Sequence, residues 1–273
     1  ILLLSLNGLF SNGLPVDTVT MTSIRSLFAA MTLIIFIIII NSRVALPNIK
    51  TTFIVYGLGI LMGMHWLTYF YSMRTASVAI GMLTLYTYPM MTIFIEPLFT
   101  KKKIAKIDIL MGGIVFIGLI IIVSDHLSTP NSPIFIGALC GIISALAFAL
   151  RNTLQKYHCP SIASETLMLH QVIIIGVVLL GFIDVNTLTA LHSEHWFYLI
   201  LLGVFTTALA HTLLVKSYKH FAAKTVAMVS CLQPVFGSCF AWWVLNESLT
   251  MNTIIGGSII LSVAIYESAK AST

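Results

Sequence analysis

The chain has 273 residues, of which 58% are hydrophobic and only 8% are Asp, Glu, Lys or Arg, with a formal net charge of +5. A soluble domain averages about 25% of these charged residues, so both a water-covered globule and a disordered chain are excluded. The mean hydropathy of +1.01 indicates a membrane protein with many spans.

The charged residues divide the chain into ten uncharged stretches of at least 16 residues. A helix needs about 20 apolar residues to cross the hydrocarbon core, and it satisfies its own backbone in lipid. Apolar runs such as residues 33–40 lack the alternation of a β-barrel strand. We therefore predict an all-α membrane protein with ten transmembrane helices, at residues 1–14, 19–40, 51–72, 75–98, 107–124, 134–157, 164–183, 195–217, 222–245 and 251–267.

Both ends of the chain are predicted to be cytoplasmic. Cytoplasmic loops carry an excess of Lys and Arg, and an N-terminus inside the cell places twelve of the 14 basic residues there. These twelve are Arg43, Lys50, Lys101, Lys102, Lys103, Lys106, Arg151, Lys156, Lys216, Lys219, Lys224 and Lys270. The outer side keeps Arg74, Asp17, Asp125, Asp184 and Glu194. The net charge therefore reflects topology, and we expect no nucleic-acid partner.

The start of the chain and its short loops bear on where the protein resides. The first predicted helix is short and begins at Ile1 rather than Met, so we expect residues to be missing before it. We expect no signal peptide, because the start has neither basic residues nor a small-residue cleavage site. The short loops suit a bacterial inner-membrane protein.

Arg25 is a charged residue about six positions inside the helix at 19–40. Charged groups in the bilayer are costly and usually face a protein interior or a substrate path. Arg25 could bind a substrate carboxylate, or it could extend outward, with Asp17 as a possible partner. Together with His170 on the helix at 164–183, it could form an outer and an inner polar station.

Two histidines lie near the middle of predicted helices. His65 shares a helix face with Tyr69, and Trp66 is adjacent, while His211 lies on a later helix. A membrane histidine can join neighbouring helices by a hydrogen bond, or it can line a substrate pocket. A histidine that titrates near neutral pH would also permit proton coupling.

Two prolines, Pro89 and Pro234, lie within predicted helices and are hinge candidates, because each removes a backbone donor and bends its helix. The bends could gate a path or merely fit the bundle. Polar neighbours of the two prolines are candidates for lining a cavity: Tyr86, Tyr88, Ser230 and Gln233. Tyr86 and Tyr88 are about 200° apart on a regular helix, so we expect only one of them to face the cavity.

The helix at 134–157 carries a polar end and a stripe of small residues. We expect Arg151 to extend to the inner surface. Asn152 beside it and Asn7 near the start of the chain are pathway candidates. The small residues, which allow close helix packing, are Gly137, Gly141, Ala145 and Ala149, with Gly59 and Gly63 on another helix.

Several residues near helix ends are predicted to be structural. We expect an interfacial ion pair for Glu96, a helix-end role for Glu247, and a cap for the last helix from Thr250. His192 and His195 lack an evident third ligand, so we predict no metal site and no cofactor.

The two halves of the chain repeat. Five features fall into register at a shift of 144 to 146 residues: Asn7 with Asn152, Arg25 with His170, His65 with His211, Pro89 with Pro234, and Gly112-Gly113 with Gly256-Gly257. Each half holds five predicted helices, and an odd number makes the second half enter from the opposite side. This predicts two inverted five-helix repeats, at residues 1–125 and 134–270, as in many secondary transporters.

The ends of both halves resemble the EamA repeat of the drug/metabolite transporter superfamily. The resemblance lies in Ala76-Ser77, Tyr88-Pro89 and Gly112-Gly113, and then in Ala222, Gln233-Pro234, Trp242-Trp243, the run from Asn246 to Thr250, and Gly256-Gly257. The first half departs from the pattern, with Lys101-Lys102-Lys103 where an acidic residue is usual. The resemblance implies ten helices in two inverted repeats. It also implies export of amino acids, other small metabolites or drugs by alternating access without ATP.

We therefore expect a secondary transporter for a small metabolite such as an amino acid, acting in a lipid bilayer as a monomer or homodimer. No Gly-rich phosphate-binding motif is present in the sequence, so ATP drive is excluded. No acidic residue lies at mid-membrane, which favours facilitated diffusion, exchange or His-linked proton coupling. The alternatives are a membrane-embedded enzyme, and a channel or sensor without carrier activity.

Overall fold

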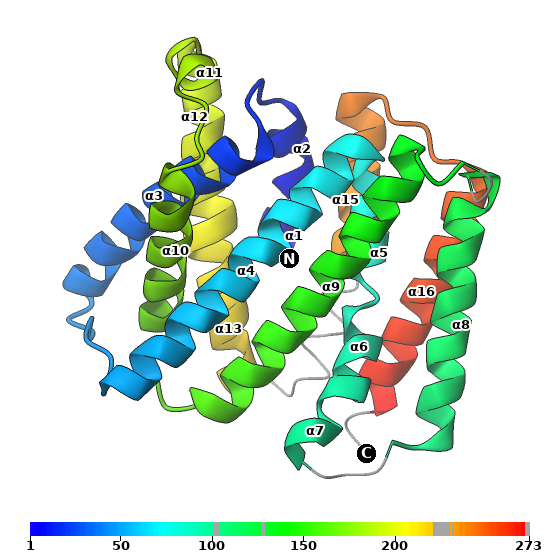
Figure 1. Ribbon diagram of the computed structural model, residues 1–273, viewed down its shortest axis with the longest axis horizontal. Coiled ribbons are helices and arrows are strands. Elements are labelled where there is room, and N and C mark those ends of the chain that lie inside the picture. Colours follow the sequence, from blue (N-terminus) through cyan, green and yellow to red (C-terminus); the bar gives the residue numbers. More distant parts are fainter. Residues whose placement is uncertain (101–103, 127–128, 221–229, 231, 271–273) are drawn as a thin grey trace.

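The computed structural model describes residues 1–100, 104–126, 129–220, 230 and 232–270 (Figure 1). Every regular element within these ranges is a helix, so the predicted all-α class is confirmed. Six helices are long and apolar enough to cross a membrane: Thr18–Ile39, Ile49–Thr75, Val78–Phe99, Lys106–His126, Pro133–His158 and Ser193–Ser217. Three shorter apolar helices are Ser164–Leu180, Leu232–Leu245 and Met251–Tyr266.

Some of the predicted features lie outside the described residues. They are the first part of the helix at 222–245, with Ala222 and Lys224, and the Lys101-Lys102-Lys103 cluster.

Most of the long helices begin where the sequence places a capping residue. The Asp17 carboxylate accepts hydrogen bonds from Val19 N and Thr20 N, at 2.8 and 3.0 Å, at the start of α3 (Thr18–Ile39). Asn48 caps α4 (Ile49–Thr75) and Ser132 caps α9 (Pro133–His158) in the same way. Thr250 Oγ1 accepts from Thr253 N at 3.1 Å, which confirms its role as the cap of α16 (Met251–Lys270).

Three predicted helices are interrupted. The segment at 1–14 forms α1 (Leu2–Ser5) and α2 (Asn7–Asn12), and the segment at 75–98 forms α5 (Val78–Leu85), α6 (Tyr88–Ile95) and α7 (Pro97–Thr100). Pro89 and Pro97 lie in the first turns after the breaks, since proline cannot continue the preceding ladder. The segment at 195–217 forms α12 (Ser193–Leu201), the π-helix η2 (Leu202–Leu209) and α13 (Ala210–His220).

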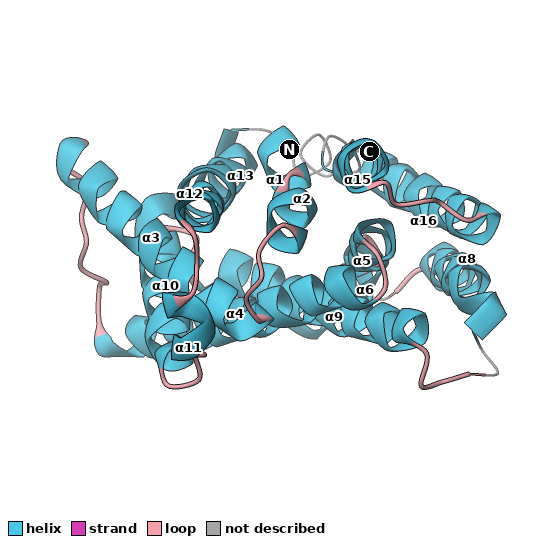
Figure 2. Cartoon of the chain, turned by 90° about the horizontal axis from the view of Figure 1, so that it is seen from above, coloured by secondary structure: helices cyan, strands magenta, loops and turns pink. Residues whose placement is uncertain are grey.

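The remaining elements complete the bundle. They are α8 (Lys106–Val123), the short 3-10 helix η1 (Ser124–His126), α10 (Ser164–Leu180), the short α11 (Val185–Thr189), and α15 (Leu232–Leu245). Seen from above, the helices form two rows, with α12, α13, α1, α15 and α16 along one side and α10, α4, α9, α5 and α8 along the other (Figure 2).

The packing relates the two halves of the chain to each other. The pair α4 and α9 makes the most extensive contact in the bundle, followed by α3 with α10 and α8 with α16. In addition, α10 packs on α4, and η2 packs on α3. The predicted shift of 144 to 146 residues relates α3 to α10, α4 to the segment that contains η2, and α8 to α16. Under this correspondence, the contact of α10 with α4 changes places with the contact of η2 with α3. The contacts of α3 with α10 and of α8 with α16 each correspond to themselves.

Small residues let α9 approach the ends of α4 and α5. A Cβ added at Gly137 would lie 2.6 Å from Ala76 Cβ and 3.0 Å from Ala76 N, and one added at Gly141 would meet Thr84 and Ser72. The predicted packing role of this stripe is therefore confirmed. Gly113 on α8 is different, because an added Cβ there would meet nothing within 4 Å.

We expect Gly137→Ala to reduce the free energy of unfolding by about 1–3 kcal/mol, because the new methyl group would collide with backbone. Gly113→Ala is the matched control, and it should be neutral or stabilising by up to about 1 kcal/mol through helix propensity. Thermal unfolding of both variants in detergent checks this. Equal melting temperatures would contradict the packing argument.

Candidate functional site

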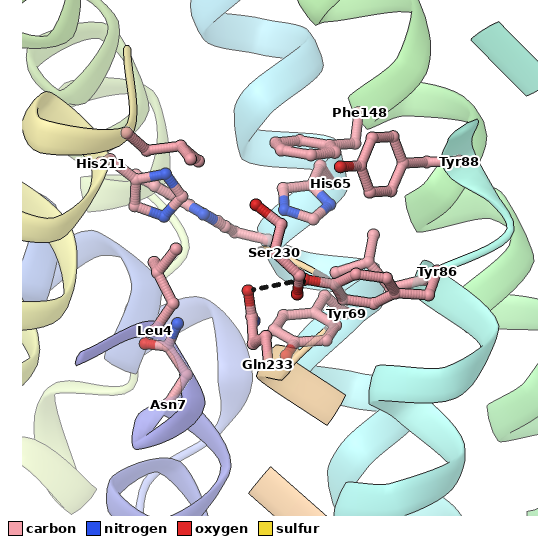
Figure 3. A pocket seen from close by; sticks show the side chains of 13 residues that line it. Leu4, Asn7, His65, Tyr69, Tyr86, Tyr88, Phe148, His211, Ser230 and Gln233 are labelled. Carbon is pink, nitrogen blue, oxygen red and sulfur yellow. Dashed lines mark hydrogen bonds between the residues drawn. The ribbon is translucent and has the colours of Figure 1, made fainter. Parts of the chain in front are cut away.

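A small, partly open cavity of about 30 Å³ lies within the bundle (Figure 3). Its lining residues come from α1, α2, α4, α5, α6, α9, α13 and α15 and from the residues beside them: Leu4, Asn7, His65, Trp66, Tyr69, Leu85, Tyr86, Tyr88, Phe148, His211, Leu214, Ser230 and Gln233. Nine of the twelve residues proposed from the sequence as pathway candidates are thus brought together. Arg25, Asn152 and His170 are not among the lining residues.

His65 both lines the cavity and joins two helices. Its Nδ1 lies 2.7 Å from Ser144 Oγ on α9, and Ser144 Oγ donates in turn to His65 O at 3.1 Å. Because the single hydroxyl hydrogen of Ser144 is used in that bond, His65 Nδ1 carries the hydrogen that it shares with Ser144 Oγ. In the neutral ring, Nε2 is then a hydrogen-bond acceptor. The ring is held between Tyr69 and Phe148, with centroid distances of 5.7 and 4.6 Å.

Both Tyr86 and Tyr88 line the cavity, so the prediction that only one of them would do so is wrong. The expected separation of 200° assumes a continuous helix, whereas the chain is interrupted at Tyr86 and Thr87. Tyr86 Oη donates to the Ser230 carbonyl and lies 3.2 Å from Gln233 Oε1 (Figure 3). The Tyr88 ring meets Phe148 edge-on, with a centroid distance of 5.0 Å.

His211 enters the cavity from the opposite row of helices. Its ring contacts Trp66 edge-on, at a centroid distance of 5.4 Å. It directly follows η2, where Thr207 Oγ1 donates to Leu202 O five residues earlier, at 2.7 Å. Each π turn holds more residues than an α turn, so η2 rotates the residues after it relative to a regular helix. The register that brings His211 to the cavity therefore depends on η2.

Arg25 lies behind the cavity wall and is fully buried, so the alternative that it extends outward is wrong. Its guanidinium carbon lies 4.2 Å from the centroid of Trp66 and 4.4 Å from that of Phe70. Asp17, its proposed partner, caps α3 instead. None of its guanidinium nitrogens has a hydrogen-bond partner among the described residues.

Arg151 is also buried, which contradicts its predicted extension to the surface. It donates to Gln171 Oε1 from Nε and Nη2, at 3.0 and 2.7 Å, and to Asn152 Oδ1 at 2.8 Å. Asn152 is thus part of this cluster, and His170 Nε2 donates to Val44 O at 2.8 Å. His170 thus contacts the loop that contains Val44, and the idea that Arg25 and His170 form an outer and an inner polar station stays a prediction.

Sequence reasoning missed the partners of these polar groups and the apolar wall of the cavity. Gln171 could have been found as the amide beside His170, but its pairing with Arg151 depends on the packing of α9 against α10. The wall residues Leu4, Leu85, Phe148 and Leu214 carry no signal, because lipid-facing positions use the same residue types.

At one end of the bundle, side chains tie the two rows of helices together. Arg74 donates to the carbonyls of Ser11, Leu14 and Val16 in and after α2. The Glu247 carboxylate accepts from Val78 N at 3.0 Å at the start of α5, which supports its predicted role as a structural helix-end residue. Burial raises the pKa of Glu247, although backbone hydrogen bonds from Val78 and Ala79 oppose this rise.

At the opposite end, Glu96 accepts from Lys156 Nζ at 2.7 Å and from Tyr157 Oη at 2.6 Å. This confirms an ion pair at Glu96. Among the residues that the structure describes, no group of three His, Cys, Asp or Glu side chains could hold a metal ion, and this includes His192 and His195.

Comparisons with known proteins agree with this architecture. A family model described as the EamA-like transporter family matches residues 2–124 and 135–266. An "uncharacterized transporter" of Helicobacter pylori is 26% identical over 209 residues, which cover 73% of this chain and 67% of the relative. An "uncharacterized transporter" of Archaeoglobus fulgidus is 24% identical, over a match that covers 76% of this chain and 73% of the relative. A crystal structure of another protein matches this fold with a TM-score of 0.69 at 13% sequence identity. The match covers 99% of this chain and 94% of the other chain, so the fold is shared.

We expect the protein to lose stability as pH rises above the ordinary glutamate pKa, because the native state binds the Glu247 proton more tightly than the unfolded state does. The stabilisation is fully present below the unfolded pKa and is lost as pH passes through the raised pKa. Melting temperatures measured from pH 4 to 7 should fall less steeply in Glu247→Gln. Glu194→Gln, at a mostly exposed side chain, should keep the wild-type profile, and identical profiles for all three proteins would refute this role.

Proposed function

The chain belongs to the EamA-like transporter family of the drug/metabolite transporter superfamily, and on that premise we propose that it is a secondary carrier of a small metabolite, working by alternating access. The observation that carries the proposal is the cavity, in which residues from both halves of the chain meet. His65, Trp66 and Tyr69 come from the first half, and His211 and Gln233 from the second. Carriers built from repeats place their substrate at such an interface.

The packing supports the proposal that the two halves are inverted repeats of five helices. If each helix is replaced by its counterpart in the other half, the contact of α10 with α4 becomes the contact of η2 with α3, and both contacts are present. The proposed symmetry mates His65 and His211 also reach one cavity from opposite rows of helices.

Alternating access requires that one end of the bundle open while the other closes. The bonds of Arg74 and Glu247 close one end in this structure, and they must break for the cavity to open there. We assign the hinge role to Pro89 and Pro234, because the helix break beside Pro89 and the start of α15 beside Pro234 both border the cavity. His65 and His211 are the groups through which a proton could be coupled; solute exchange or facilitated diffusion would use neither as an acid.

The lining favours a solute with an apolar or aromatic body, such as an amino acid. Five Phe, Trp and Tyr side chains share the wall with aliphatic residues, while amides and hydroxyls supply hydrogen bonds: Trp66, Tyr69, Tyr86, Tyr88 and Phe148. We further propose export across a bacterial inner membrane, with both termini cytoplasmic, by a monomer or homodimer.

Liposomes that contain the purified protein test the carrier role. We expect saturable uptake of a labelled amino acid or related metabolite from a panel, accelerated by the same solute inside the vesicle. Trp66→Ala should raise KM roughly 2- to 10-fold by removing an aromatic contact. Phe116→Ala, which removes an exposed ring on α8, is the control and should change nothing. Linear flux would indicate a channel, and product formation without flux an enzyme.

Labelling of single cysteines on intact cells tests the orientation. In a background without native cysteines, an impermeant maleimide should label Asp125→Cys directly and Arg43→Cys only after permeabilisation, because basic loops stay inside. Both positions are exposed. If both cysteines were labelled from outside the cell, the proposed topology would be wrong, and so would the inverted repeat.

A further inference from the structure

Arg25 is a buried cation for which the described part of the protein provides no counter-charge. Its exposed fraction is 0%, and Nε, Nη1 and Nη2 all lack hydrogen-bond partners within the described residues. Buried charges in proteins are normally paired or hydrogen-bonded. Trp66 and Phe70 stabilise the guanidinium through their ring faces, but a ring carries no net negative charge.

Arg151 shows how this fold treats an arginine that serves structure. It is nearly as buried as Arg25, with an exposed fraction of 3%, yet its donors meet the side-chain oxygens of Gln171 and Asn152. The two arginines lie at comparable burial in one bundle. The lack of acceptors at Arg25 is therefore a property of that position and not of buried arginines in general.

One aromatic side chain contacts both Arg25 and the cavity. Trp66 contacts the guanidinium and also lines the cavity, where it meets His211. None of the thirteen lining residues in the described chain is acidic, and the nearest acid along α3, Asp17, is engaged at the helix start. The positive potential of Arg25 consequently reaches the cavity without a nearby carboxylate to cancel it.

We propose that the transported solute is a small organic carboxylate with an apolar or aromatic body, and that Arg25 selects its charge. This inference rests on the proposed carrier function and adds the substrate class. A carboxylate in the cavity supplies the counter-charge that the described protein groups do not. An amine would place a second positive charge beside Arg25 in a site of low dielectric, where repulsion is strong. The leucines and rings of the wall fit the body of the solute.

Matched ligands separate charge from shape. The probes are 3-phenylpropanoate, 3-phenylpropanamide and 3-phenylpropylamine, together with the same three head groups on a branched and on a straight alkyl chain. Binding to the purified full chain is followed by the rise in melting temperature with ligand concentration. We expect the carboxylates to bind at least about tenfold more tightly than their amides, and the amines to bind least. Amines that bind as well as carboxylates, or carboxylates no better than amides, would overturn the proposal.

Variants assign the selectivity to Arg25. Arg25→Gln should bring carboxylate affinity down to that of the amide, while Arg25→Lys should retain a preference for the carboxylate. Arg43→Gln removes an exposed charge elsewhere and should leave both affinities unchanged. If Arg25→Gln does not fold, the order of ligands on the wild-type protein still decides. Saturable flux of an amine would contradict the carboxylate inference but would leave the carrier function in place. Carboxylate binding without any flux would contradict only the carrier function.

Discussion

Lipid offers no water to a freed backbone group, so a membrane helix can be interrupted only where protein groups or a polar cavity take over. The interruptions here follow that constraint. The break between α1 and α2 and the break between α5 and α6 border the cavity, and the π-helix η2 precedes the α13 residues that line it. The neighbouring helices α3, α4, α8, α9, α10 and α16 run without a break and form the frame that supports it.

Side-chain hydroxyl groups form hydrogen bonds with backbone carbonyls in or beside the interrupted segments. Thr87 Oγ1 donates to Thr84 O, Thr207 Oγ1 to Leu202 O, and Ser5 Oγ to Gln233 O. These bonds pair the hydroxyls with backbone carbonyls in or beside the interrupted segments, so these polar side chains are satisfied within the protein. The side chains that line the cavity are held in the same manner, as the bond between His65 and Ser144 shows.

The sequence alone was sufficient for features set by the thickness of the bilayer. Uncharged stretches predicted the long helices closely, for example 51–72 against Ile49–Thr75 and 134–157 against Pro133–His158. Polar residues within those stretches pointed to the cavity, because the bilayer makes them costly. Features set by tertiary contact could not be predicted: Arg151 turns inward because Gln171 lies on α10, and Tyr88 joins Tyr86 because the helix stops between them.

The phenol of Tyr86 joins the two halves of the chain beside the cavity. It extends from the end of α5 to the Ser230 carbonyl and the Gln233 amide beside the start of α15. Any displacement of one of these segments must stretch that contact or replace it with another polar partner, in a place where bulk solvent is scarce. The bridge thus acts as a mechanical linkage, through which strain at the interruption between α5 and α6 is transmitted directly to α15.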